Sequence, residues 1–154
     1  MKFSDFILYN AIVTDLKAKN KEEVISEMVQ ALVDAGGLKS DDVDAVVEKI
    51  RIREELGSTG IGHGIAVPHT KFDNIDKLVG TVAISQGEGV DFDSLDCEKV
   101  KLFFLLVSPT SQSGEHLRAL EHITNKLRDE GFVRYLKQCY KFEDVKALLE
   151  EADE

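Results

Sequence analysis

Two segments in the first third of the chain carry apolar residues at the spacing of an amphipathic helix. In the first, apolar side chains recur on one face of a 3.6-residue period; they are Val24, Ile25, Met28, Val29 and Leu32. Asn20 and Glu23 have the spacing of a capping box at its start, and Gly36-Gly37 ends it. The second helix is expected from Ser40 to about Leu56, with a buried face made of Val43, Val46, Val47 and Ile50.

Short apolar runs at 65–67, 78–85 and 100–107 predict strands. The run at 100–107 is almost continuously apolar, as in a strand that is buried on both faces, so helices must cover both sides of the sheet. Further helices are expected from Ser113 to near Gly131, over 132–139 and over 143–152. The order of elements predicts an α/β fold, one domain over residues 1–154, with a mixed β-sheet sandwiched between helices.

Composition and charge narrow the class of protein. The chain has 154 residues, of which 43% are hydrophobic, and a formal net charge of −10. A strongly acidic chain is a poor partner for nucleic acid or for an anionic membrane surface. Cys97 and Cys139 have no metal-ligand spacing, and neither a signal peptide nor an apolar run long enough to cross a bilayer is visible. We therefore expect a cytoplasmic protein without a disulfide, a metal or membrane insertion.

The segment from Gly57 to Lys71 carries the candidate chemistry. It gathers glycines and hydroxyl side chains before the sequence Ile65-Ala66-Val67-Pro68-His69. Glycines let backbone N–H groups turn toward an anion. A strand over 65–67 would place His69 at its end, where open α/β sheets bind ligands, and Pro68 would end the ladder and fix the direction of His69. Such a histidine can accept a phosphoryl group, bind a metal or move a proton.

Three stretches resemble the active-site signature of one family. These are Leu56–Gly62, Gly64–His69 and Gly114–Leu117, and they resemble the enzyme IIA domains of the bacterial phosphoenolpyruvate-dependent sugar phosphotransferase system, in the fructose, mannitol and nitrogen-regulatory (type 2) branch. The resemblance covers essentially the whole chain and implies the type-2 IIA fold. It implies that His69 takes a phosphoryl group from a small histidine phosphocarrier protein and passes it to a IIB domain. His63 is a departure, because this branch commonly carries Asn or another polar residue there.

The other histidines are weighed by their helical positions. At about 100° per residue, Leu120, Ile123 and Leu127 lie close to His116 on the predicted third helix, so His116 continues the inward stripe. That position fits a core histidine, and it also fits an anion site at a helix N-terminus; the resemblance places a second active-site histidine here. His122 lies on the polar side and is expected to be solvated. His63 fits either the border of the site or a loop surface.

Basic and acidic residues near the motif complete the candidate site. Arg51 and Arg53 lie about 200° apart on a helix, so only one can face the motif, and the resemblance selects Arg53. Lys71 is a weaker candidate for a local positive charge. The predicted site has His69 as nucleophile, with His116 and Arg53 stabilising the phosphoryl group. Its phosphate-binding loop is formed by Gly60, Gly62, His63 and Gly64, and acidic residues that could ring it are Glu54, Glu55, Asp73 and Asp76.

These residues predict a phosphohistidine carrier that needs no cofactor. No Walker-type loop or kinase-like set of metal ligands is present, so the phosphoryl donor is expected to be a protein. The resemblance implies that the acceptor is a IIB component of a sugar transport system, and it is expected to be a separate protein, since no fused IIB, IIC or phosphocarrier domain is visible. The alternative is a nitrogen-regulatory type of IIA that signals to a regulatory protein. A zinc hydrolase using His63, His69 and His116, or a non-catalytic anion-binding module, stays as a weaker alternative.

Overall fold

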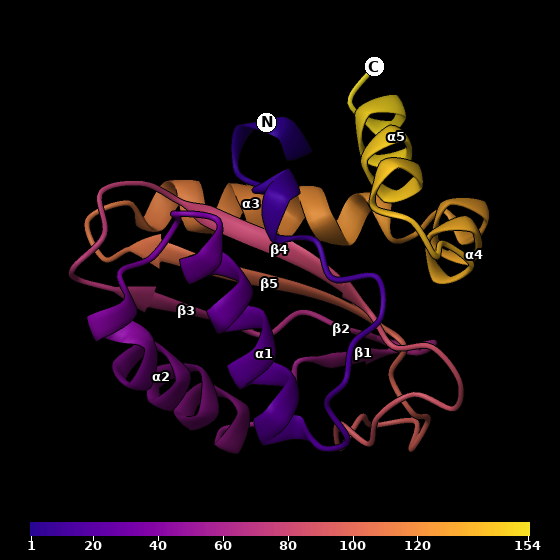
Figure 1. Ribbon diagram of the computed structural model, residues 1–154, viewed down its shortest axis with the longest axis horizontal. Coiled ribbons are helices and arrows are strands. Elements are labelled where there is room, and N and C mark those ends of the chain that lie inside the picture. The colour runs from indigo at the N-terminus through magenta and orange to yellow at the C-terminus, as the bar shows by residue number, and fades with distance from the viewer.

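The computed structural model describes residues 1–154. Its helices and strands follow one another along the chain as α1 Lys21–Asp34, α2 Val43–Glu55, β1 Gly60–Gly62, β2 Ile65–Ala66, β3 His69–Phe72, β4 Val79–Ile84, β5 Leu102–Pro109, α3 Ser113–Lys126, α4 Glu130–Lys137 and α5 Phe142–Ala152. Short 3₁₀ turns lie at Phe3–Asp5, Tyr9–Ala11 and Ser40–Asp42. Figure 1 shows α1 and α2 on one face of the sheet and α3, with α4 and α5, on the other. The predicted α/β sandwich is confirmed.

Strand β5 is the centre of a mixed sheet. It pairs antiparallel with β4 along one edge and parallel with β2 and β3 along the other. Ile65 of β2 lies opposite Leu102, and His69 of β3 lies opposite Leu106. β2 and β3 are therefore two halves of one path beside β5, interrupted at Val67 and Pro68. Strand β1 pairs antiparallel with β2 and forms the outer edge.

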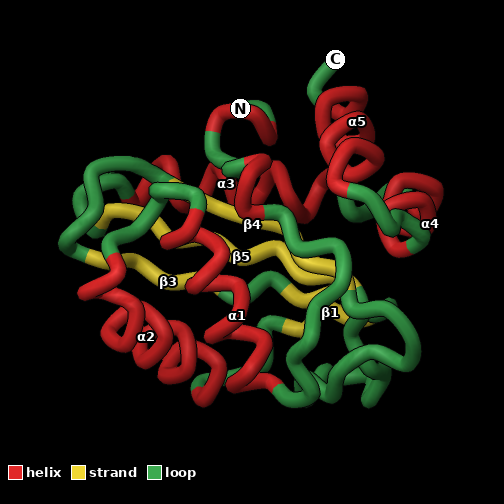
Figure 2. Tube along the Cα trace, viewed as in Figure 1, coloured by secondary structure: helices red, strands yellow, loops and turns green.

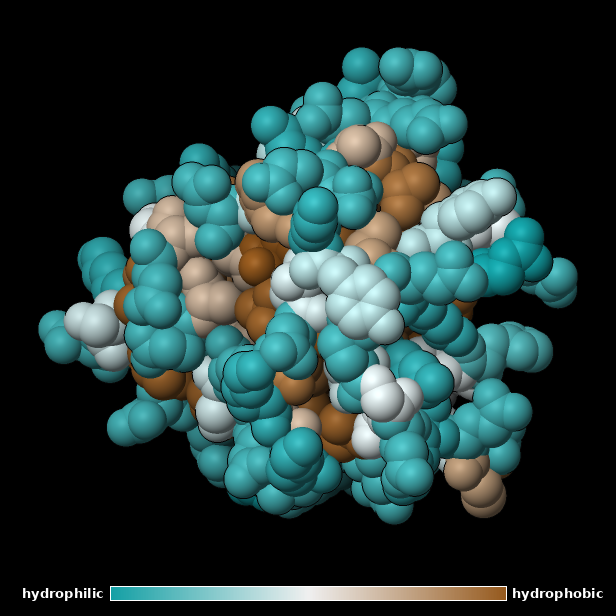
Figure 3. Space-filling view, turned by 45° about the vertical axis from the view of Figure 1, so that its right-hand side comes forward, coloured by the Kyte–Doolittle hydropathy of each residue, from teal (hydrophilic) through white to brown (hydrophobic).

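Alternate residues of β5 serve two separate cores, as the pleat of a strand requires. Phe103, Leu105 and Val107 belong to the core beneath α1 and α2, and Leu102, Phe104 and Leu106 belong to the core beneath α3, α4 and α5. Figure 2 shows the strands enclosed between the two helical layers. The nearly continuous apolar sequence of this strand follows directly from burial on both faces. The face of the molecule in Figure 3 is mainly hydrophilic, with hydrophobic side chains visible in patches.

Most helices and strands begin and end within a few residues of the positions that capping residues, glycines and apolar runs predict. The side chain of Asn20 caps α1 by accepting from the Glu23 N–H at 2.9 Å, but Glu23 accepts from the N–H of Lys19, at 2.8 Å, and not from that of Asn20. The third helix ends at Lys126, earlier than expected, because Asp129 caps a new helix over the predicted break at Gly131.

The two ends of the chain pack together over α3, as Figure 1 shows. Asp153 accepts hydrogen bonds from the backbone N–H groups of Phe3 and Ser4, at 2.7 and 3.1 Å. His122 lies beneath this contact, with its ring centroid 4.5 Å from that of Phe3 and its side chain only 15% exposed. The expectation that His122 is solvated is wrong, because the N-terminal segment covers the side of α3 that its sequence made polar. None of the helices is long and apolar enough to span a bilayer.

Candidate functional site

The interruption between β2 and β3 determines how His69 is presented. The sequence pattern predicts His69 after the end of a strand, but His69 is the first residue of β3. The Pro68 carbonyl accepts from the Leu106 N–H at 3.1 Å, so pairing with β5 continues past the proline. His69 shares its register with Leu106, and neighbouring partners in a parallel sheet project to the same face. The His69 side chain therefore lies on the face that α3 covers.

One ring nitrogen of His69 is occupied by the backbone. Its Nδ1 lies 2.7 Å from the Val67 carbonyl oxygen. Because a carbonyl oxygen only accepts, Nδ1 carries the proton in the neutral ring and Nε2 keeps a free lone pair. Burial lowers the pKa of His69, and the positive charge of Arg53 lowers it further, against opposing effects of the Val67 hydrogen bond and of Glu54. At neutral pH the residue is thus an unprotonated imidazole with one reactive nitrogen.

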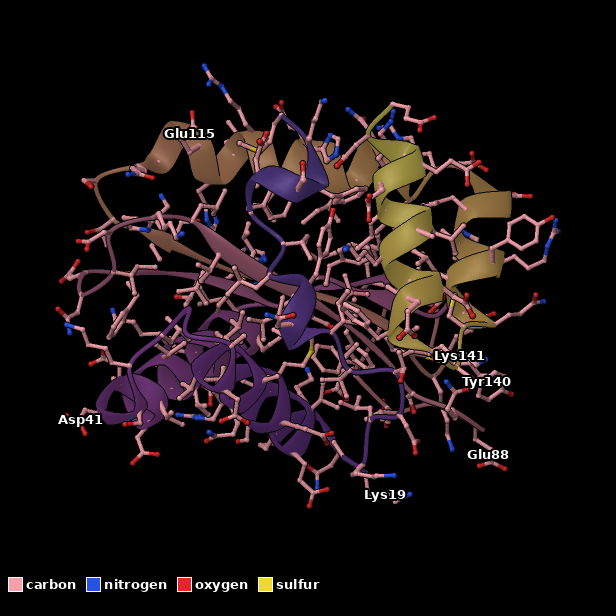
Figure 4. All side chains as sticks on the ribbon, turned by 45° about the horizontal axis from the view of Figure 1, so that its top comes forward. Lys19, Asp41, Glu88, Glu115, Tyr140 and Lys141 are labelled. Carbon is pink, nitrogen blue, oxygen red and sulfur yellow. The ribbon has the colours of Figure 1, made fainter.

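His116 faces His69 from the first turn of α3. The two ring centroids are 5.5 Å apart. His116 is buried, and its Nδ1 lies 2.5 Å from the hydroxyl oxygen of Ser108 on β5. Burial first, then the charges of His69 and Lys71, lower the pKa of His116 to about 4. The burial of His116 confirms the inward position predicted for it, and the adjacent Glu115 projects to the outside of α3 in Figure 4.

Arg53 and Arg51 lie on different sides of α2, as the helical geometry requires. Arg51 is held on the outer side of α2 by ion pairs with Glu48 and Glu55. The Arg53 Nη1 instead donates to the Gly57 carbonyl at 2.8 Å, and its charge acts on His69. The structure therefore brings Arg53, and not Arg51, to the histidine. Its guanidinium forms no ion pair with a carboxylate and retains donors for an anion.

Lys71 supplies a second positive charge on the same face. It follows His69 by two residues on β3, and its Nζ donates to the Ser113 hydroxyl at 3.1 Å, at the first residue of α3. Its charge lowers the pKa of His116. Arg53 and Lys71 therefore make the surroundings of the two rings positive in a chain whose net charge is −10.

A buried carboxylate beneath the site was missed by sequence reasoning. Glu54, 5% exposed, accepts from the Thr59 N–H at 3.1 Å, from the Thr59 hydroxyl, and from Lys21 Nζ at 3.1 Å. It fixes the start of the glycine-rich segment against the ends of α1 and α2. The earlier suggestion that it rings the site as a surface charge is wrong. The signal was present, since Val46, Ile50 and Glu54 continue one stripe at a spacing of four residues.

The structure does not bring the predicted phosphate-binding loop to His69. Gly60, Gly62, His63 and Gly64 form a hairpin whose turn leads into β2 opposite Leu102. His69 lies opposite Leu106, four residues further along β5, or about 13 Å at 3.3 Å per residue. His63 is exposed, with a φ of 57°, and its N–H donates to Asp96 Oδ2 at 3.0 Å. Only the beginning of the segment, Gly57, approaches the site, through its bond to Arg53.

The positive φ angles of Gly62 and Gly64, 89° and 75°, explain these glycines as turn residues. The same placement removes the zinc alternative, because His63 stands apart from His69 and His116. Across the chain, no three side chains of His, Cys, Asp or Glu are grouped as the ligands of a metal would be.

Comparisons with known proteins agree with the fold. The family model "Phosphoenolpyruvate-dependent sugar phosphotransferase system, EIIA 2" matches residues 5–152. A protein of Bradyrhizobium diazoefficiens named "Nitrogen regulatory protein" is 34% identical over 149 residues, which cover 97% of this chain and 95% of that protein.

Two solved structures are similar along nearly the whole chain. The nitrogen regulatory protein IIA-Ntr of Neisseria meningitidis is 29% identical, with a TM-score of 0.84 over 96% of this chain and 98% of that one. The IIA component in a complex of mannitol enzyme IIA and phosphorylated enzyme IIB of Escherichia coli is 26% identical, with a TM-score of 0.76 over 93% and 95% of the two chains. The similar structures thus include a regulatory and a sugar-specific protein.

Proposed function

The chain belongs to the EIIA 2 family of the phosphoenolpyruvate-dependent sugar phosphotransferase system, and on that premise we propose that it is a phosphohistidine carrier with Nε2 of His69 as its nucleophile. The observation that carries the proposal is the 2.7 Å contact between His69 Nδ1 and the Val67 carbonyl. It leaves a single free nitrogen on a ring that burial keeps uncharged. No separate general base is needed, because a neutral imidazole is already a nucleophile near pH 7.

In the accepting step, the Nε2 lone pair forms a bond to the phosphorus of a phosphohistidine on the donor protein. The donor's P–N bond breaks, and its electron pair returns to the donor imidazole. The ring of His69 gains positive charge, which spreads to Nδ1–H and is stabilised by the Val67 carbonyl oxygen. Passing the group to a IIB nucleophile reverses these changes. No proton has to move to or from His69 in either direction.

Arg53, His116 and Lys71 would stabilise the negative charge on the transferring phosphoryl group. Phosphoryl transfer depends on positioning and charge stabilisation of the equatorial oxygens. The Ser108 hydroxyl can donate to His116 Nδ1, which places the His116 proton on Nε2 and makes this ring nitrogen a hydrogen-bond donor while the ring is neutral. Ser108 would thus act as a positioning residue through His116.

The partners we propose are a histidine phosphocarrier protein as donor and a IIB component as acceptor, meeting in the cytoplasm. The mannitol IIA of the solved complex, a structural relative, is bound to a phosphorylated IIB. Leu56 and Leu117 flank the site residues in sequence and are 82% and 58% exposed. Such apolar side chains beside a charged centre suit two partners that dock briefly in turn over a small interface.

A regulatory role is the second candidate, and it uses the same site. It is favoured by the likeness to two proteins named for nitrogen regulation, one of them the structure with the higher TM-score of the two compared above. In that role the phosphorylation state of His69 would set the affinity for a regulatory protein.

Transfer of labelled phosphoryl groups tests the proposal. The wild-type chain is incubated with a phosphorylated histidine phosphocarrier and then with a sugar-specific IIB domain. The proposal expects a covalent, acid-labile phosphoryl group on the chain that is absent from His69→Ala. Its passage to IIB supports transport, and retention on the chain supports the regulatory candidate. Phosphorylation of His69→Ala at the wild-type level would overturn both.

A further inference from the structure

A groove lies at the end of the sheet remote from His69, between the β1–β2 hairpin turn and the helices α3 and α4. Its volume is about 790 Å³, within the range of small-molecule sites. Ile65, Leu127 and Val133 are among its apolar lining residues. The hairpin turn at His63 forms one wall, and Lys137 Nζ joins the two walls by donating to the His63 carbonyl at 2.5 Å.

Four cations gather in this groove. Lys101 comes from the loop before β5, Arg128 follows α3, and Arg134 and Lys137 belong to α4. None of the four forms an ion pair with a carboxylate, although Arg51, Arg118 and Lys99 elsewhere on the surface do. Glu130 is the only acidic residue that lines the groove. The lining of the groove is therefore basic, although the chain as a whole carries a net charge of −10.

The positive charges of the groove act on one another. Lys137 is half-buried, and burial together with the charge of Lys101 lowers its pKa, against the opposing charge of Glu98. Like charges held together over apolar surface repel, and an anion between them removes that repulsion. Arginine forks and lysine ammonium groups are the side chains that bind phosphate and carboxylate oxygens.

We propose that this basic groove, defined by Lys101, Arg128, Arg134 and Lys137, binds a small organic polyanion that carries an apolar group. The cations bind two or more phosphate or carboxylate groups, and the apolar group covers Ile65, Leu127 and Val133. The site is separate from the phosphoryl-transfer centre. Along β5 the two are four residues apart, and along α3 the helix runs from His116 near one to Leu127 at the other.

Titrations followed by ¹H–¹⁵N NMR test the groove. ATP is the probe for the complete ligand class, citrate and pyrophosphate test the charge alone, and adenosine tests the apolar part alone. The proposal expects saturable binding of ATP that is tighter than that of the partial probes. The shifted amide signals should come from the hairpin turn, the end of α3 and α4, and they should be retained in His69→Ala. This last result separates the groove from the proposed carrier function.

The decisive variant is Lys101→Gln/Arg134→Gln. Both residues are exposed, and neither side chain forms an ion pair with a carboxylate. This double substitution should weaken the binding of ATP by roughly tenfold or more, because each cation contributes a charge-assisted hydrogen bond. The matched control Lys39→Gln/Lys49→Gln removes the same charge from exposed positions outside the groove and should change binding by less than about twofold. Lack of saturable binding, equal loss in the two variants, signals confined to the His69 region, or binding of acidic peptides but not of ATP would overturn the proposal.

Discussion

His116 Nδ1 and the Ser108 hydroxyl oxygen lie 2.5 Å apart, and both side chains are buried. Ser108 is two residues beyond Leu106 on β5 and so shares the face that carries His69 and Lys71. One strand therefore positions two histidines from different elements. β5 pairs with the strand that carries His69, and its own hydroxyl orients His116.

Removing that hydroxyl should slow phosphoryl transfer, and it should do so only by its effect on His116. Ser108→Ala leaves a buried ring nitrogen without a partner, which costs about 1–3 kcal/mol. We expect the lost orientation of His116 to raise the transfer barrier by a similar amount, a loss of about 5- to 160-fold in the single-turnover transfer rate. In a His116→Gln background the same change should have little further effect. Stopped-flow or quench measurements on the wild type, the two single variants and the double variant give the coupling between Ser108 and His116. Equal losses in both backgrounds would show that Ser108 acts on the sheet and not on His116.

The two arginines of α2 provide a matched pair. Arg53→Ala should slow transfer by about 10²–10³-fold, as removal of a preorganised donor to a developing charge does. Arg53→Lys should recover only part of the rate, because an ammonium lacks the planar fork. Arg51→Ala removes only exposed ion pairs and should stay near the wild-type rate. Similar rates for Arg51→Ala and Arg53→Ala would reduce Arg53 to a cap of its helix.

Histidine titration should report two neutral rings at pH 7. NMR should find the pKa of His116 near 4 and that of His69 below its usual 6.5, because burial is the first cause in both. Phosphoryl acceptance should therefore be flat around neutral pH and fall in acid as Nε2 becomes protonated. A His69 midpoint at or above 6.5 would contradict the assignment of a buried, neutral nucleophile.

The same shifts link stability to pH. A histidine whose pKa is lower in the folded state contributes stability above pH 6.5, and that contribution is lost as pH falls toward the folded pKa, about 4 for His116. The loss from His116 is up to about 3 kcal/mol. His116→Gln should flatten the acid side of the stability curve measured by urea unfolding. An unchanged slope would mean that His116 titrates normally.

Glu54 should matter for stability far more than its neighbour. Glu54→Gln leaves Lys21, whose side chain is 13% exposed, with only the outer carboxylate of Asp93. We expect a loss of about 2–4 kcal/mol in the free energy of unfolding, as for a broken buried pair. Glu55→Gln, at an exposed position, should cost less than about 1 kcal/mol. Equal losses of unfolding free energy in Glu54→Gln and Glu55→Gln would show that the Glu54 carboxylate is exposed to solvent.

Periodicity and turn chemistry were sufficient for the first two helices and the central strand. The apolar stripe after Asn20, the glycine pair at 36–37 and the apolar run of β5 each reflect local requirements that the sequence states directly. The distinction between Arg51 and Arg53 also followed from helical geometry once the resemblance had selected one of them.

Features set by tertiary pairing were not predictable in the same way. Pro68 was expected to end a strand, and β2 does end before it, at Ala66. The Pro68 carbonyl nevertheless accepts from the Leu106 N–H, and pairing with β5 resumes at His69. The glycines around His63 were assigned to phosphate because their role in a hairpin depends on pairing between β1 and β2. His122 was assigned to solvent because nothing local shows that Phe3 would cover it.

The most direct test of the central claim is the position of the phosphoryl bond. The chain is labelled with ¹⁵N in its histidines, phosphorylated by the histidine phosphocarrier, and examined by ¹⁵N and ³¹P NMR under basic conditions that preserve phosphohistidine. The bond to the Val67 carbonyl predicts one phosphoryl group, on Nε2 of His69, with Nδ1 still protonated. Attachment to Nδ1 of His69, or to His116 or His63, would contradict the account.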